Sequence, residues 1–141
     1  MKTETLSFIT AGAETTAYVA MPDAADSAKS VIVIQEWWGL NDHIKDIANR
    51  YAGEGFTAIA PDLYRGRLAT NPQEAGRMMQ ELKIEDGLDT IKNALDAARE
   101  EYGRLVLTVS DDGQGGGNAE PREGYGIGLV NVHDRLAARF G

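Results

Sequence analysis

The chain has 141 residues, of which 43% are hydrophobic and 26% charged, a composition typical of one globular domain and unlike disordered or collagen-like chains. Its net charge of −8 excludes nucleic acid as an expected partner, because an acidic surface repels phosphates. The absence of cysteine excludes disulfides, thiolate metal sites and a cysteine nucleophile. The sequence contains no recognisable leader and no apolar run of membrane-spanning length, so we expect a cytoplasmic protein that does not bind membranes.

The first half of the chain shows strand patterns and one helix pattern. Residues 6–9 and 16–21 alternate as strands do, and AGAE between them indicates a hairpin turn. The β-branched run SVIVIQEWWG is typical of a strand buried on both faces of a parallel sheet. A helix capped by Asn41 or Asp42 follows, with an apolar stripe of Ile44, Ile47, Ala48 and Tyr51.

The second half continues the alternation of strands and helices. FTAIAPDLY is expected to form a buried strand, and helical structure is expected over 72–102 with a break near Asp86 and Gly87. RLVLTVS indicates a third buried strand, and a last helix is expected over 129–140. The pattern predicts a single three-layer α/β domain over 1–141, with a mainly parallel sheet of about five strands, an N-terminal antiparallel hairpin and about four helices.

The segment VIVIQEWWGLNDHIKDIANRYAGEGFTAIAPDLYRG gives residues 1 to about 102 a specific resemblance to the dienelactone hydrolase family of α/β-hydrolases. The resemblance implies half of an α/β-hydrolase fold, with strand order 1-2-4-3-5. It also implies a hydrolase cleft in which a backbone N–H near Trp37 belongs to the oxyanion hole and Glu36 lies beside the nucleophile.

The nucleophile of that family is a cysteine in a sharp turn between strand and helix. This chain has VSDDG there, so the resemblance sets Asp111 at the nucleophile position and sets the family's later aspartate and histidine beyond Gly141. Asp111 could act as a carboxylate nucleophile, but that chemistry needs a base to activate water. His43 and His133 are expected to be ordinary helix residues, and Asp111 with Asp112 is expected to end a strand and open a turn. We therefore expect no catalytic residue.

Residues about 103 to 141 resemble instead the ATP-binding domain of sensor histidine kinases, in the GHKL superfamily. The resemblance rests on LVLTVSDDGQGG and GYGIGLVNVHDRL, whose matching positions are Asp111, Gly113, Gly115, Gly124, Gly126, Gly128 and Asn131. It implies that Asp111 accepts a hydrogen bond from adenine and that the second glycine box approaches the phosphates. Asn93 loosely imitates the asparagine that holds Mg²⁺ in that family.

Simpler interpretations compete with these site residues. The glycines of residues 113–117 are typical of a mobile loop, and phosphate binding at Gly126 and Gly128 is disfavoured by nearby acidic residues, namely Asp111, Asp112, Glu120 and Glu123. One of the two tryptophans at 37 and 38 is expected to pack and the other to be exposed, and Glu36 to make a structural hydrogen bond. Acidic pairs such as Asp62 and Glu85 lack metal-ligand spacing, so no metal site is expected.

Because both resemblances are partial, we infer that the chain is a recombined, engineered chimera. The leading hypothesis is a folded scaffold without the catalytic activity of its parents. Such a scaffold requires no cofactor. One alternative is weak purine-nucleotide or phosphate binding, with ATP or ADP and Mg²⁺ at low affinity. The other alternative is residual ester or lactone hydrolysis. An uncovered apolar strand at 104–110 would also favour a homodimer, formed through that edge or by segment exchange.

Overall fold

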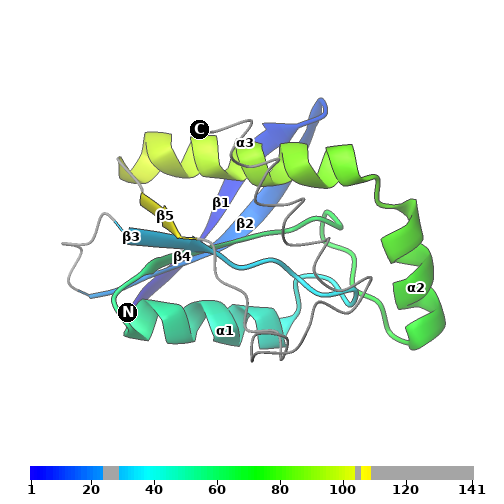
Figure 1. Cartoon of the computed structure of the whole chain (residues 1–141), viewed down its shortest axis with the longest axis horizontal. Coiled ribbons are helices and arrows are strands. Elements are labelled where there is room, and N and C mark those ends of the chain that lie inside the picture. The colour runs from blue at the N-terminus through cyan, green and yellow to red at the C-terminus, as the bar shows by residue number, and fades with distance from the viewer. Residues whose placement is uncertain (24–28, 104–105, 109–141) are drawn as a thin grey trace, which may run out of the picture. The chain divides into compact units, whose positions relative to one another are not determined.

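The computed structural model describes residues 1–23, 29–103 and 106–108 (Figure 1). The chain divides into two compact units, Met1–Thr108 and Val109–Gly141, and every described residue belongs to the first. The expected helix over 129–140 lies outside the described residues. Within the described part, no helix combines the length and the apolarity needed to cross a bilayer.

A long antiparallel hairpin begins the sheet. Strands β1 (Lys2–Thr10) and β2 (Ala13–Met21) pair along their whole length, from Lys2 opposite Met21 to Thr10 opposite Ala13. The two residues between them, Ala11 and Gly12, have φ values of 48° and 72°. Two consecutive positive φ angles are typical of the type I′ turn, whose twist matches that of the strands it joins.

The remaining strands are shorter and make the sheet mixed. They are β3 (Lys29–Ile32), β4 (Thr57–Pro61) and β5 (Val106–Thr108), and the order across the sheet is β1-β2-β4-β3-β5. β2 is antiparallel to β4, whereas β3 is parallel to both β4 and β5. The N-terminal hairpin was expected, but a mainly parallel sheet is not confirmed, because β2 is also antiparallel to β4.

Strand β3 also ends earlier than the run SVIVIQEWWG predicts. Its ladder finishes at Ile32, and the Val33 amide makes one more bond to the Ile59 carbonyl at 2.9 Å. The chain then reverses direction, with the Gly39 amide donating to the Glu36 carbonyl at 3.1 Å. The polar end of the run therefore forms a loop at the edge of the sheet.

Two asparagines start the first two helices, α1 (Asp42–Gly53) and α2 (Pro72–Glu81). The Asn41 side chain accepts from the Ile44 amide at 3.1 Å, and the Asn71 side chain accepts from the Glu74 amide at 2.8 Å. Each bond satisfies an amide that a helix cannot pair internally. Of the two expected caps for α1, Asn41 is therefore the one that forms.

Helix α3 (Ile84–Tyr102) follows α2 after a break at Leu82 and Lys83, whose ψ angles of 112° and 138° are extended. The break was expected four residues later, near Asp86 and Gly87. Gly87 instead lies in the first turns of α3, where its amide bonds to the Lys83 carbonyl at 3.0 Å. The described part of the chain thus contains three helices.

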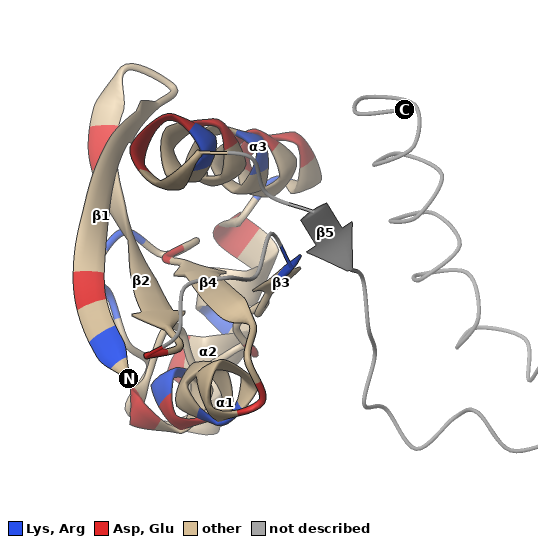
Figure 2. Cartoon of the chain, turned by 90° about the vertical axis from the view of Figure 1, so that its left-hand side faces the viewer, with Lys and Arg blue, Asp and Glu red and all other residues tan. Residues whose placement is uncertain are grey.

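Helices α1 and α3 cover opposite faces of the sheet (Figures 1 and 2), and β4 supplies both apolar cores. Ala58 and Ala60 pack on the side of α1, and Ile59 packs on the side of α3. Alternate residues of a strand point to opposite faces, so a strand buried on both faces is apolar along most of its length. This explains the apolar run from Ala58 to Pro61, which follows the buried Thr57.

Side-chain hydrogen bonds join α3 to the hairpin at two places. The Asn93 amide donates to the Thr10 hydroxyl at 3.0 Å, and the Tyr102 hydroxyl donates to the Glu4 carboxylate. Burial, and then the bond to Glu4, raises the pKa of Tyr102. These two bonds therefore join α3 to both ends of β1.

Substitution of Leu95 by alanine tests the core beneath α3. Leu95 is 1% exposed, so Leu95→Ala should lower the free energy of unfolding by about 2–5 kcal/mol through lost burial and a new cavity. Ile84 on the same helix is 64% exposed, and Ile84→Ala should change stability by no more than about 0.5 kcal/mol. Urea denaturation of both variants measures the difference, and similar losses would contradict this packing.

Candidate functional site

The candidate site lies at the carboxyl ends of the parallel strands. Because β3, β4 and β5 run in the same direction, the loops after β3 and β4 leave the sheet at one edge. The connection from β3 leads to β4 on one side, and the next connection leads to β5 on the other side of β3. Ligands of open α/β sheets bind beside such a switch point.

The loop after β3 exposes an acidic and an aromatic side chain. Glu36 is exposed, Trp37 is 38% exposed and Trp38 is half-buried. The two indole rings meet edge to face with their centroids 5.4 Å apart. Trp38 also accepts a bond from the Ala69 amide at 3.0 Å, which joins this loop to the loop after β4.

Gly39 allows the two loops to approach closely. Its φ is +100°, and a Cβ at this position would lie 2.7 Å from the carbonyl oxygen of Arg67. Any other residue would therefore combine an unfavourable backbone angle with a steric clash. Glycine here is a requirement of the turn that presents Glu36 and Trp37.

The Trp37 amide is the candidate oxyanion donor implied by the sequence. Within residues 1–23, 29–103 and 106–108, the structure records no hydrogen-bond partner for this N–H. The neighbouring turn uses the Gly39 amide and the Glu36 carbonyl instead. The loop thus leaves the Trp37 amide able to donate to a ligand oxygen.

The Gln35 side chain joins the loop after β3 to the loop after β4. Its Oε1 accepts from the Leu63 amide at 3.0 Å, which also fixes the orientation of the side-chain amide because only oxygen can accept there. The residue is 9% exposed, and its Nε2 is buried without a partner in the described part of the chain. A buried donor without a partner lowers the stability of the fold, so Gln35 is a residue that the packing beside Glu36 holds at a cost in free energy.

Asp62 shapes the loop after β4. Its carboxylate accepts from the Tyr64 amide at 3.1 Å and from the Gly66 amide at 2.7 Å. Its backbone is joined to β2, because its carbonyl accepts from the Thr15 hydroxyl at 3.2 Å and its amide donates to the Thr16 carbonyl at 2.9 Å. Asp62 therefore has a structural role in the described part of the chain.

Sequence reasoning missed Gln35 and the role of Asp62. A polar residue inside a β-branched run was the available signal for Gln35, and an aspartate directly after Pro61 was the signal for Asp62. Neither signal names a partner, because the bonds to Leu63 and Thr15 depend on strand pairing.

The site residues predicted from the sequence do not all lie in one place. Glu36 and Trp37 lie together in the loop after β3, but the expected structural hydrogen bond of the Glu36 carboxylate is absent from the bonds recorded in the described residues. Asn93 bonds to Thr10, and His43 is an exposed residue of α1. The following candidates lie outside the described residues: Asp111, Asp112, Gly113, Gly115, Gly124, Gly126, Gly128, Asn131 and His133.

Comparisons with known proteins agree with the hydrolase resemblance. Residues 15–108 match the model of the "Dienelactone hydrolase family". A "Putative carboxymethylenebutenolidase" of Aquifex aeolicus is 40% identical over 92 residues, which cover 63% of this chain and 38% of that protein. A "Putative carboxymethylenebutenolidase" of Saccharolobus solfataricus is 55% identical over 53 residues, covering 38% of this chain and 20% of that protein.

A solved structure supports the same fold. The "Putative Dienelactone Hydrolase" of Klebsiella pneumoniae superposes with a TM-score of 0.64 at 28% identity, covering 75% of this chain and 48% of that chain. The chain therefore spans less than half the length of these relatives.

These findings correct two expectations. The hypothesis of a scaffold without hydrolytic activity is contradicted, because the matched family and the named relatives are hydrolases. The expected boundary near residue 102 was also too early, since the family match continues to residue 108 and includes β5. β5 thus belongs with the hydrolase-like segment.

The close approach at Gly39 gives a stability test. Gly39→Ala should lower the free energy of unfolding by about 1–3 kcal/mol, because it adds strain and a clash with Arg67. Gly76 lies inside α2 with open space around it, and Gly76→Ala should raise stability by about 0.5–1 kcal/mol. Denaturant titration compares them, and a neutral Gly39→Ala would contradict the proposed constraint.

Hydrogen exchange tests the contact between Gln35 and Leu63. Gln35→Leu removes the acceptor, so exchange of the Leu63 amide should become at least about tenfold faster, as expected for the loss of about 1.4 kcal/mol of protection. The Tyr64 amide bonds to Asp62 and serves as an internal control that should change less. Equal changes at both amides would show general loosening instead of a local contact.

Proposed function

The chain belongs to the dienelactone hydrolase family, and we propose that its loop after β3 is part of a site that hydrolyses small esters or lactones. The observation that carries this proposal is the exposed Glu36–Trp37 pair at the carboxyl ends of parallel strands, inside the segment that matches the family. The names of the relatives favour a lactone as the substrate class.

The Trp37 amide is the proposed oxyanion donor. When a nucleophile adds to an ester carbonyl, the carbonyl oxygen gains negative charge, and a fixed N–H stabilises that charge more than it stabilises the substrate. Gly39 and the bond from Ala69 to Trp38 hold the loop in place before substrate binds. The exposed Trp37 ring offers an apolar surface to the rest of the substrate.

Asp111 is the proposed reacting carboxylate, on the basis of its place in the sequence three residues after Thr108. Its attack on the carbonyl carbon would break the C–O bond of the ester and release the alkoxide, which takes a proton from water. The hydroxide ion formed when the alkoxide takes its proton from water would then hydrolyse the resulting anhydride and restore the carboxylate.

The kinase-like resemblance of residues 103–141 yields a separate proposal, now limited to the part after Thr108. Weak binding of ATP or ADP with Mg²⁺ would use the glycine boxes and Asp111, all outside the described residues. Such binding should be saturable and should be lost in Asp111→Ala, whereas hydrolysis predicts turnover without any nucleotide.

A homodimer remains a proposal as well. β5 forms the outer edge of the described sheet, and an uncovered strand edge can pair with a second copy. Sedimentation equilibrium at high concentration tests this, and a monomer would contradict it.

Ester turnover tests the proposed hydrolytic function. With 4-nitrophenyl acetate and dihydrocoumarin as substrates, the chain should show saturable hydrolysis above the buffer rate. Asp111→Asn should lower kcat at least about tenfold, whereas Asp46→Asn, on the exposed surface of α1, should not. A buffer-level rate, or a rate unchanged by Asp111→Asn, would contradict the proposal.

A pair of substitutions at Trp37 separates the amide from the ring. Trp37→Ala removes the ring but keeps the N–H, so it should mainly raise KM. Trp37→Pro also removes the N–H and should lower kcat by a further factor of about 100, the usual effect of losing an oxyanion donor. Thermal unfolding of both variants checks that the fold survives, and equal kcat values would exclude the amide as the donor.

A further inference from the structure

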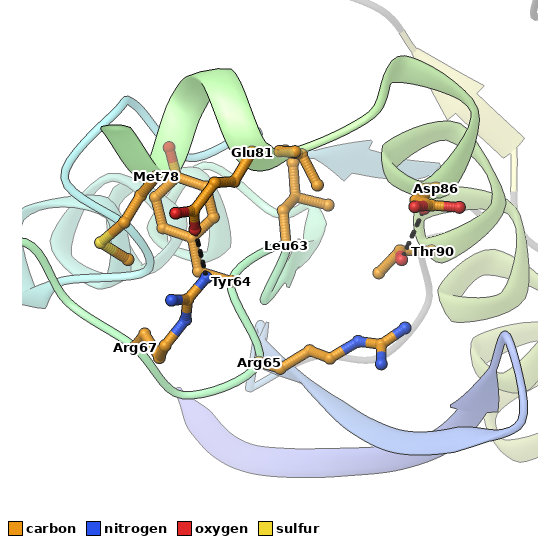
Figure 3. Close-up of a pocket in the computed structure, with 9 residues that line it drawn as sticks. Leu63, Tyr64, Arg65, Arg67, Met78, Glu81, Asp86 and Thr90 are labelled. Carbon is orange, nitrogen blue, oxygen red and sulfur yellow. Dashed lines mark hydrogen bonds and ion pairs between the residues drawn. The ribbon is translucent and has the colours of Figure 1, made fainter. Parts of the chain in front are cut away.

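A second possible site is a cavity of about 400 Å³ between the loop after β4, the end of α2 and the start of α3 (Figure 3). Its apolar lining includes Leu63, Met78 and Leu82, and its polar lining includes Arg65, Asp86 and Thr90. Glu36 and Trp37 are not among its lining residues, so the cavity is distinct from the proposed hydrolytic site.

Arg65 is held in a backbone conformation that favours glycine. Its φ is +52°, and the next residue, Gly66, has a φ of +86°. The two bonds that the Asp62 carboxylate accepts, from Tyr64 and Gly66, close the loop around Arg65. A strained residue that its surroundings fix in place is a recurring feature of binding sites.

The Arg65 guanidinium is only weakly engaged. Its one recorded bond in the described part of the chain is a long one, 3.4 Å, to the Thr10 carbonyl. Arg67, in contrast, lies 3.6 Å from the Glu81 carboxylate. Of the two arginines that line the cavity, Arg65 therefore keeps the greater capacity to bind a ligand.

Asp86 supplies the opposite charge. Figure 3 shows the Arg65 side chain below Thr90 and Asp86 above it. The Thr90 hydroxyl donates to the Asp86 carbonyl at 2.8 Å, which fixes the first turn of α3 without using the Asp86 carboxylate. Among the described residues no ion pair joins Arg65 to Asp86, so a cation and an anion both border the cavity unpaired.

We propose that this cavity binds a zwitterionic α-amino acid with an apolar side chain. Arg65 would bind its carboxylate with the paired N–H groups of the guanidinium, and Asp86 would bind its ammonium group. Leu63, Met78 and Leu82 would contact the apolar side chain. A simple organic anion fits less well, because Asp86 and Glu81 would repel it, and the volume is within the range of small-molecule pockets.

Calorimetry with L-leucine tests this proposal, and the matched probes are N-acetyl-L-leucine and L-leucinamide. The first lacks the ammonium charge and the second lacks the carboxylate, so each should bind at least about tenfold more weakly than L-leucine. Saturable binding of L-leucine is expected, with ¹⁵N–¹H shifts confined to residues 63–67 and 82–90. Absence of saturable binding, or equal affinity for all three probes, would overturn the proposal.

Two variants test whether Arg65 binds the carboxylate of the ligand and Asp86 its ammonium group. Arg65→Gly removes the cation and relieves the backbone strain, so it should weaken L-leucine binding at least about tenfold while the Tm stays equal or rises. Asp86→Asn should weaken L-leucine binding but strengthen the binding of N-acetyl-L-leucine, because this anion is no longer repelled by the Asp86 carboxylate. Arg50→Gln, on the exposed surface of α1, is the control. Wild-type affinity in Arg65→Gly would contradict the role of the guanidinium.

Discussion

The hydrogen bond between the Gln35 side chain and the Leu63 amide joins the loops after β3 and β4, which carry the candidate site. It lies just beyond the parallel pairing of β3 with β4, where two segments distant in sequence leave the sheet together. The bond from the Ala69 amide to the Trp38 carbonyl joins the same two loops at a second point, farther along the chain from β3 and β4. With Gly39 in close contact with Arg67, these contacts fix how Glu36 and Trp37 are presented.

Asp62 connects the loop after β4 to strand β2. Its backbone bonds hold the end of β4 to β2, while its carboxylate determines the path of the loop through Tyr64 and Gly66. The same loop lies between the proposed hydrolytic site and the cavity bordered by Arg65. The buried Asp62 therefore supports both surfaces, and each oxygen of its carboxylate accepts one recorded hydrogen bond from a backbone amide.

Local patterns in the sequence predicted the local structure well. The hairpin turn, the Asn41 cap and the largely apolar strand β4 all follow from residues within a few positions of one another. The end of β3 and the break at Leu82 were placed wrongly, because ladder pairing and packing against other elements decide them. The contact from Gln35 to Leu63 could not be predicted, since it depends on the register of two strands. The scaffold hypothesis gave too much weight to the unusual end of the chain and too little to the long family match.

An ¹⁵N–¹H titration with a small aryl phosphonate measures directly whether the Trp37 amide can donate to a ligand. The anionic phosphonate imitates the charged tetrahedral oxygen that an oxyanion donor must bind. We expect a saturable downfield shift that is largest at the Trp37 amide, with smaller changes at Glu36 and Gly39. A Trp37 resonance that does not move while others saturate would contradict the assignment of this loop as a hydrolytic site.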